Sequence, residues 1–400
     1  MGSGRSPSPG DEDGLLDDPV RLEAIDAGGL LRAAATAGAQ VRSTAAAAEE
    51  AGLRRLTGER PRALVLLTRP GAASAAAPLL LALLGPSCPI PVVATRSVPM
   101  WTGALDIVLA NTPDPGDREL AEGLDRAVRR GAQVVLTAPA DGPVAAAVAG
   151  RAVLIVPRIE VPPGLALPRA LTAGLLLLDA LGLLATDIEA LAGELDREAE
   201  RDHVAHESLV NPAKSLALRL TGRTPLLWGT DPVATAVAVH CAGALAAHAG
   251  VVAHAAGFHE AAALPVLRWE AVRGSEEADI FADPFDDSLG DPLGDPLGDS
   301  YEDPPWGAMP AVRPVLLGVL ADAGSEPERA AALDALPAAD VVTADEELMV
   351  RHGDPGAAAS AAAVLALRFD FAALYLGLSR GVLGRPGWIG SGGSADPPDE

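Results

Sequence analysis

The sequence predicts an α/β fold made of two tandem domains, each a mainly parallel sheet between two layers of helices. The length of 400 residues exceeds what one hydrophobic core usually holds, which favours two domains. Short apolar runs alternate with longer segments of helical spacing, which is typical of parallel α/β structure. Residues 210–260 show this best, because a helix, a strand, an Ala-rich helix and a second strand follow one another there as a βαβ unit.

The first domain is expected in residues 61–185, after N-terminal helices in residues 15–60. Its predicted strands are short runs rich in Val, Leu and Ile, as buried parallel strands are. They are residues 63–67, 92–95, 106–110, 133–137 and 152–156, and a long helix begins at Leu167. An acidic amphipathic helix in residues 186–207 is expected to link the two domains.

The second domain is expected in residues 208–385. Its predicted strands are residues 224–228, 251–253, 266–272, 312–320 and 341–342, and its helices are residues 212–221, 234–249, 326–336 and 357–381. An insert at residues 273–310 repeats a unit rich in Gly, Asp and Pro and is predicted to be a disordered, solvated loop. The polar ends, residues 1–14 and 386–400, are predicted to be disordered tails.

Composition excludes several classes of partner. The formal net charge of −24 argues against nucleic acid and against an anionic membrane, since both need a basic footprint. Cys88 and Cys241 are isolated, and residues 1–14 lack an apolar core, so a reducing cytoplasm is expected. Residues 233–258 carry no formal charge, but their glycines and histidines favour a buried α/β core over a membrane span.

Several motifs are similar to those of one known family. VNPAK at residues 210–214, WGT at residues 228–230, an uncharged helix and a final His259-Glu260 resemble the second half of phosphoglucose/phosphomannose isomerases. DFAALYLGLSRG at residues 370–381 resembles the last long helix of that family. The resemblance covers roughly residues 15–385. It implies two sugar isomerase (SIS) domains, a homodimer, a sugar or sugar-phosphate ligand and no cofactor.

The resemblance also locates a phosphate-binding region, in which this chain differs from the family pattern. Gly71 is the one glycine in a turn that is glycine-rich in the family, and Thr112 stands at the first hydroxyl position of the next such turn. Asp114 and Asp117 replace two gripping hydroxyls, while Glu119 matches a family glutamate. A carboxylate about 4 Å from a phosphate charge costs roughly 1–4 kcal/mol, depending on screening. An acidic surface turn that caps the next helix is the favoured alternative.

The catalytic residues that the resemblance implies are incomplete. Arg169 matches the arginine that stabilises the enediol-like intermediate, and His259 matches the ring-opening histidine. Gly243, sixteen residues before His259, stands where the family has its proton-shuttling glutamate, and the family's C-terminal lysine is absent. No metal site is expected, because the histidines lack ligand spacing. Two hypotheses remain: an eroded site with a regulatory or scaffold role, or an active aldose–ketose isomerase with an altered site.

Overall fold

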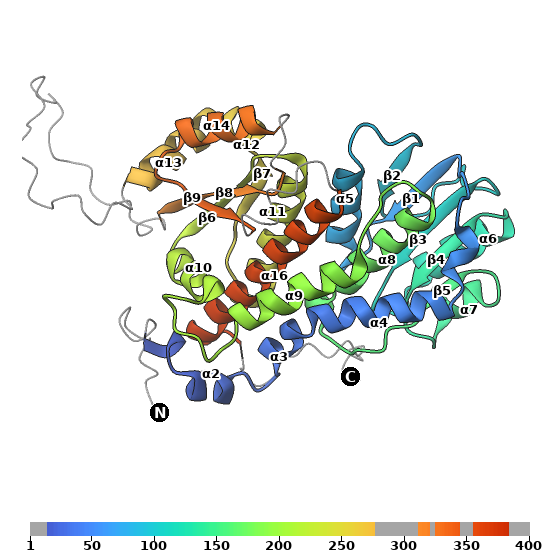
Figure 1. The fold of residues 1–400 in the computed structure, drawn as a ribbon, viewed down its shortest axis with the longest axis horizontal. Helices are drawn as coiled ribbons and strands as arrows, with labels where there is room; N and C mark the ends of the chain where they lie inside the picture. Colours follow the sequence, from blue (N-terminus) through green and yellow to red (C-terminus); the bar gives the residue numbers. More distant parts are fainter. Residues whose placement is uncertain (1–13, 277–310, 321–324, 345–354, 384–400) are drawn as a thin grey trace, which may run out of the picture.

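Two parallel sheets, one in each half of the chain, organise the residues described by the computed structural model (Figure 1). These are residues 14–276, 311–320, 325–344 and 355–383. The α/β class and the parallel sheets that the sequence predicts are confirmed. The tails that are predicted to be disordered, apart from Gly14, and most of the predicted insert, residues 277–310, lie outside the described residues.

The N-terminal segment forms several short helices and one longer one. They are α2 (Pro19–Ile25), α3 (Leu30–Ala35) and α4 (Ala37–Glu50), followed by a 3-10 turn, η1 (Leu53–Leu56). Helices α3 and α4 are separated at Thr36, whose hydroxyl donates to the carbonyl of Ala33 at 2.7 Å. A hydroxyl bonded to the preceding turn competes with the helical backbone bond at that point.

The first sheet has the order β2-β1-β3-β4-β5, with every pair parallel. Its strands are β1 (Ala63–Leu67), β2 (Val92–Thr95), β3 (Asp106–Asn111), β4 (Gln133–Thr137) and β5 (Val153–Ile155). The helices between and after them are α5 (Ala73–Leu84), α6 (Arg118–Arg129), α7 (Pro143–Val148) and α8 (Leu167–Ala180). The chain reverses its direction of winding between β1 and β3, and in open parallel sheets ligands bind at the carboxyl ends of strands at such a point.

The second sheet has the order β7-β6-β8-β9 and is also parallel throughout. Its strands are β6 (Thr224–Gly229), β7 (His254–Gly257), β8 (Val312–Gly318) and β9 (Asp340–Thr343). The helices are α9 (Ile188–Arg201), α10 (Pro212–Leu220), α11 (Pro232–Ala244), α12 (Phe258–Ala262), α13 (Pro265–Glu276), α14 (Glu326–Ala335) and α16 (Pro355–Ser379). A π-helical turn, η3 (Leu245–Ala249), extends α11.

Two predicted strands of this half are wrong. Residues 251–253 connect η3 to β7 instead, because Gly250 is left-handed and the N–H of Val251 donates to the carbonyl of Leu245 at 3.1 Å. Residues 266–272 lie in helix α13, which runs on to Glu276 and moves the start of the predicted insert from residue 273 to beyond that helix. Leu267 and Ala271 are spaced i, i+4 and join the apolar cluster under β8, so the run buries its apolar residues with helical periodicity.

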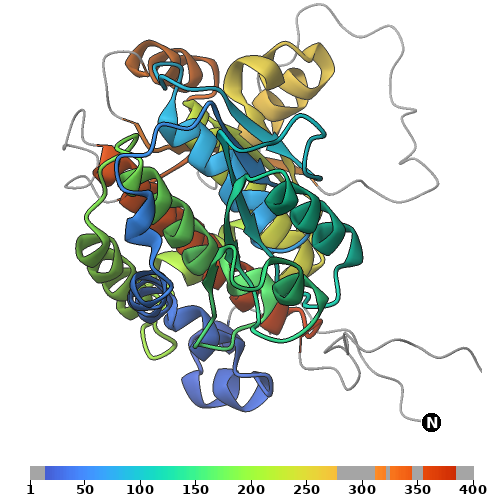
Figure 2. The same ribbon diagram turned by 90° about the vertical axis from the view of Figure 1, so that its right-hand side faces the viewer.

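Helices from both halves share one core. Helices α4, α9 and α16 lie side by side across the molecule (Figures 1 and 2), while α5 of the first half packs directly against α11 of the second. A single apolar cluster includes residues of both sheets and all of these helices. The loops that follow the carboxyl ends of the strands in both sheets are therefore supported by one continuous hydrophobic core.

Two described helical segments are long and apolar enough to cross a bilayer by length and composition. These are Pro232–Ala249, with a mean hydropathy of 1.3, and Gly356–Ser379, with a mean hydropathy of 1.7. The apolar window of the second is entirely buried inside the protein, and that of the first is half buried. Core helices of globular proteins have the same character.

Candidate functional site

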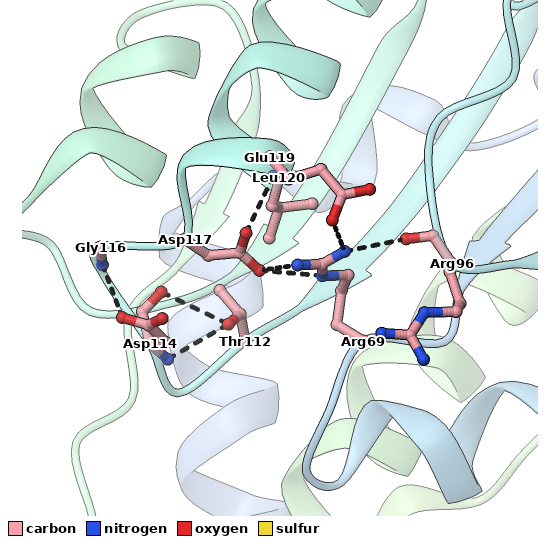
Figure 3. A network of polar contacts seen from close by, with 8 residues as sticks. All are labelled: Arg69, Arg96, Thr112, Asp114, Gly116, Asp117, Glu119 and Leu120. Atoms are coloured by element: carbon pink, nitrogen blue, oxygen red, sulfur yellow. Dashed lines mark hydrogen bonds and ion pairs between the residues drawn. The ribbon is translucent and has the colours of Figure 1, made fainter. Parts of the chain in front are cut away.

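A buried arginine occupies the point where the first sheet reverses its winding. Arg69 follows β1, and its side chain is only 9% exposed. Its Nε donates to Oδ2 of Asp117 at 2.8 Å and its Nη1 to Oε2 of Glu119 at 2.9 Å (Figure 3). Nη2 also donates to Oδ2 of Asp117 at 2.5 Å and Nη1 to the carbonyl of Arg96 at 3.3 Å, so the guanidinium joins its own turn after β1 to the segments after β2 and β3.

The turn after β3 uses its polar groups internally. Oδ1 of Asp117 caps α6 by accepting from the N–H of Leu120 at 3.0 Å, as the capping alternative predicts. Thr112 accepts from the N–H of Asp114, and Asp114 in turn accepts from the N–H of Gly116 at 2.8 Å (Figure 3). The turn is therefore stabilised by hydrogen bonds between its own residues.

Opposite charges determine the electrostatics of this cluster. Burial by itself would lower the pKa of Arg69, but its hydrogen bonds and charge interactions with Glu119 and Asp117 raise the pKa overall. Asp117 is likewise well covered, with a side chain 10% exposed, whereas that of Glu119 is 64% exposed. Asp117 and Glu119 thus both pair with Arg69, a residue that sequence reasoning passed over, whereas Asp114 accepts a hydrogen bond within its own turn. The sequence signal for this pairing is an arginine directly after β1 together with an acidic turn after β3, the strand beside β1 in the sheet.

In the second half of the chain, a carboxylate also caps the helix that follows a parallel strand. Asp231 follows β6, is buried, and accepts from the N–H groups of Ala234, Val319 and Leu320 at 2.8–3.0 Å. Burial raises the pKa of Asp231, although these three backbone bonds oppose the shift. The N-terminus of α11 and the end of β8 are therefore satisfied by this side chain.

Gly71 and Gly243 line one cavity of about 190 Å³ between α5 and the α11–η3 helix. A Cβ placed on Gly243 would meet no atom within 4 Å, so the position of the absent glutamate opens onto free space. His240 and His248 line the same cavity. The α11–η3 helix therefore places two histidines beside the position of the missing glutamate. Sequence reasoning interpreted this helix mainly as apolar.

The other residues assigned by resemblance lie elsewhere, since none of them lines this cavity. His259 is 68% exposed on α12, with Nε2 at 3.8 Å from Oε1 of Glu328. Arg169 is buried on α8 and donates from Nη1 to the carbonyl of Ile159 at 3.2 Å. Burial lowers the pKa of Arg169, and its Nε has no partner among the described residues.

The VNPAK motif has a structural role. Asn211 caps α10 by accepting from the N–H of Lys214 at 2.9 Å. Lys214, the one lysine of the chain, is fully buried and donates to the carbonyls of Val204 and His206 at 2.8 and 2.6 Å. The motif holds the loop that enters the second sheet domain. Among the described residues, no group of three or more His, Cys, Asp or Glu is placed to hold a metal ion.

A family model matches the second half of the chain, and solved structures resemble most of the chain in fold. Residues 209–383 match the model of the bacterial phospho-glucose isomerase C-terminal SIS domain. Among solved structures, a candidate phosphosugar isomerase from Silicibacter pomeroyi superimposes with a TM-score of 0.55 at 16% identity, covering 89% of this chain and 99% of that one. A comparison with curated proteins gave no match.

Two further structures are similar over most of their length. The C-terminal domain of glucosamine-fructose-6-phosphate aminotransferase from Francisella tularensis has a TM-score of 0.57 at 9% identity, covering 88% of this chain and 96% of that one. Tagatose-6-phosphate ketose/aldose isomerase from Escherichia coli has a TM-score of 0.52 at 11% identity, covering 88% and 90%. At these identities the similarity is one of fold.

Proposed function

The chain is a tandem SIS-domain protein whose residues 209–383 belong to the bacterial phosphoglucose isomerase C-terminal SIS domain family, and from this premise we propose that it binds a carbohydrate derivative without isomerising sugar phosphates. In this proposal the isomerase site has eroded and the protein acts as a regulatory or scaffold partner. Homodimer formation and a cytoplasmic location belong to the same proposal.

The pairing of Arg69 with Asp117 and Glu119 carries the proposal. A phosphate held at this turn needs free donors and an unpaired positive charge. Here the guanidinium is already bonded to two carboxylates, so an arriving phosphate would have to displace them. Gly243 supports the proposal independently, because a glycine cannot move a proton between C1 and C2 of a sugar.

The test is turnover and binding by the purified full chain. We expect no conversion of glucose 6-phosphate or mannose 6-phosphate to fructose 6-phosphate above the buffer rate. Calorimetry should give no micromolar binding of fructose 6-phosphate at physiological salt. Turnover by the native chain that is lost in His259→Ala, or micromolar binding, would contradict the proposal.

A double variant tests the physical reason. Asp114→Ser with Asp117→Thr keeps a residue able to cap α6 and releases one partner of Arg69, so fructose 6-phosphate should bind at least about tenfold more tightly. Asp125→Ser with Asp141→Thr removes the same charge elsewhere in the first domain and is the matched control. Equal gains in both variants would mean that only net charge matters.

The second candidate is an active isomerase with an altered site, which His240 favours. It stands three residues before Gly243 on α11, so both lie on one face of the helix and line one cavity. An imidazole there could serve as the base. In that case native turnover would be measurable and His240→Ala would abolish it.

A further inference from the structure

The loop between β2 and β3, residues 96–105, exposes three large apolar side chains. Met100 is 66% exposed, Trp101 47% and Leu105 69%. A single exposed apolar residue is ordinary on a protein surface, but a group of them marks an interaction site. None of the three belongs to the candidate sugar site, so their exposure calls for a separate explanation.

Hydrogen bonds to the backbone hold this loop in place. Nη2 of Arg62 donates to the carbonyl of Trp101 at 3.2 Å, and the guanidinium lies 5.7 Å from the centre of the Trp101 ring. The backbone N–H of Arg62 donates to the carbonyl of Leu105 at 2.7 Å, and Arg130 donates to the carbonyl of Met100. The apolar side chains therefore stand on a fixed backbone, which reduces the entropy that a partner loses in ordering them.

Arginines make the surface beside these side chains positive. Arg126 lies in the last turn of α6 and Arg130 is its C-terminal cap residue. A Cβ on Gly123 would lie 3.2 Å from Val98 and 4.0 Å from Nη2 of Arg126, which places this guanidinium next to the loop. Asp125 pairs with two other arginines, and no ion pair forms at Arg126 or Arg130 within the part of the chain that the structure describes. Both charges are therefore free to attract an anionic partner.

The sequence of residues 286–303, the acidic repeat, has the complementary chemistry. Seven of these 18 residues are Asp or Glu, and none is Lys or Arg. Leu289, Leu293 and Leu297 recur every four residues, and each is followed by Gly-Asp. An apolar side chain next to a carboxylate, three times over, matches an apolar surface next to unpaired arginines.

We propose that the Trp101 surface, formed by Met100, Trp101 and Leu105 with Arg126 and Arg130, binds the acidic repeat of a second copy of this chain. The leucines of the repeat cover the exposed apolar side chains, and its aspartates face the two arginines. Trp, Met and Arg are enriched at protein interfaces, and Trp and Arg are the commonest residues whose loss weakens binding strongly. Two copies that exchange their repeats form a closed, two-fold dimer.

The position of the repeat in the fold favours a second copy over the same copy. The repeat follows α13, which lies at the opposite end of the long axis from β2 and α6 (Figure 1). Each copy carries a net charge of −24, but at physiological salt charges more than about 8 Å apart are largely screened, so the charges at the contact decide. The proposal goes beyond the proposed function and makes no use of the sugar site.

The first test is binding of a fluorescein-labelled synthetic peptide of residues 286–303, followed by fluorescence anisotropy. The receptor is the full chain with Leu289→Ser, Leu293→Ser and Leu297→Ser, so that its own repeat does not compete. The peptide should bind with a Kd on the order of 10 µM at physiological salt. A peptide with the same three serines keeps its charge and should bind at least about tenfold more weakly, because the apolar contact is lost.

Variants of the receptor link binding to the surface. Trp101→Ser should weaken peptide binding at least about tenfold, and Arg126→Ser about threefold. Trp269→Ser is the control for the first, because Trp269 is another exposed tryptophan and also has an arginine over its ring. Arg118→Ser, at the other end of α6, is the control for the second. Both controls should bind the peptide as the receptor does, and far-ultraviolet circular dichroism would verify that each variant is folded.

The second test is sedimentation velocity at about 50 µM, above the expected Kd. The native chain should sediment as a dimer, whereas Trp101→Ser and the variant with three serines in the repeat should each sediment as monomers. An equimolar mixture of these two variants should recover part of the dimer, because one copy retains the surface and the other retains the repeat. Binding within one copy would give no recovery.

Each contrary result overturns a defined part of the proposal. Equal peptide affinity with and without Trp101→Ser, or equal affinity for the serine peptide, would overturn the pairing of the surface with the repeat. Equal sedimentation of the native chain and both variants, or a mixture without dimer, would overturn the second copy as the partner. Trp101-dependent binding to phosphatidylglycerol vesicles without peptide binding would replace the repeat by a membrane. None of these results alters the turnover expected under the proposed function, so the two proposals fail separately.

Discussion

At the scale of single residues, Arg69 shows how an apparently unfavourable substitution can be accommodated. Acidic side chains at a presumed phosphate turn suggest repulsion when they are considered alone. With the buried guanidinium between them, Asp117 and Glu119 become structural partners that join the turns after β1 and β3. Under the proposed function, loss of the sugar-phosphate site and gain of this ion-pair cluster are one change rather than two.

Arg69→Met should lower the free energy of unfolding by roughly 3 kcal/mol, because it leaves the covered Asp117 without its charge partner. Glu119→Gln should cost less than about 1 kcal/mol, since that carboxylate is largely exposed. Urea denaturation of the two variants measures the contrast. Combining Arg69→Met with Asp117→Asn should recover part of the loss, and strict additivity would show that the pair is not coupled.

At the scale of elements, carboxylates of the chain cap helices that follow two of the parallel strands. The N-termini of α6 and α11 are occupied by Asp117 and Asp231 from the chain itself. Such termini attract anions through their free N–H groups, and here a capping carboxylate already accepts from one of them, the N–H of Leu120 in α6 and of Ala234 in α11. The open space lies instead along the side of α11, where Gly243 interrupts the row of side chains.

Asp231→Ala should lower the free energy of unfolding by roughly 2–4 kcal/mol, since it removes the cap of α11 and leaves two more buried N–H groups unpaired. Asp187→Ala is the matched control: Asp187 caps α9 on the exposed surface through one bond to Ala190, and its loss should cost about 1 kcal/mol. Chemical denaturation provides both values. Equal losses would mean that Asp231 acts as a simple cap.

At the scale of the whole molecule, the long helices join the two sheet domains. Arg368 on α16 pairs with the buried Glu198 on α9 at 3.1 Å and also donates to the carbonyl of Thr343 at 2.9 Å. Helix α9 in turn packs on α4, which packs on α8 of the first domain. The cavity between α5 and α11 therefore depends on both halves being docked.

This joined core should make unfolding cooperative. In urea the chain should unfold in a single transition, because neither sheet retains its apolar cover without the helices it shares with the other. Tryptophan fluorescence, which includes the buried Trp228 of the second sheet, and far-ultraviolet circular dichroism should give coincident curves. Two separated transitions would show that the halves are independent folding units.

The sequence by itself determined the class of the fold and most of its elements. Apolar runs such as residues 63–67 and 107–110 match β1 and most of β3, because a strand buried on both faces is predominantly apolar. Periodicity was ambiguous where a run was short, and residues 266–272 were assigned to the wrong element for that reason. The lack of a carboxylate at Gly243 was also readable directly from the sequence.

Only the tertiary structure decided which side chains act together. Arg69 and Asp117 are 48 residues apart, and His240 and Asp370 are 130 apart, so no local pattern records either pair. The surroundings of His259 were not readable from the sequence either. The motif suggested a catalytic role for this residue, but in the fold its side chain is exposed beside Glu328. A local pattern reports whether a residue is buried, whereas its partner depends on how distant elements pack, and that packing created both the Arg69 cluster and the cavity at His248.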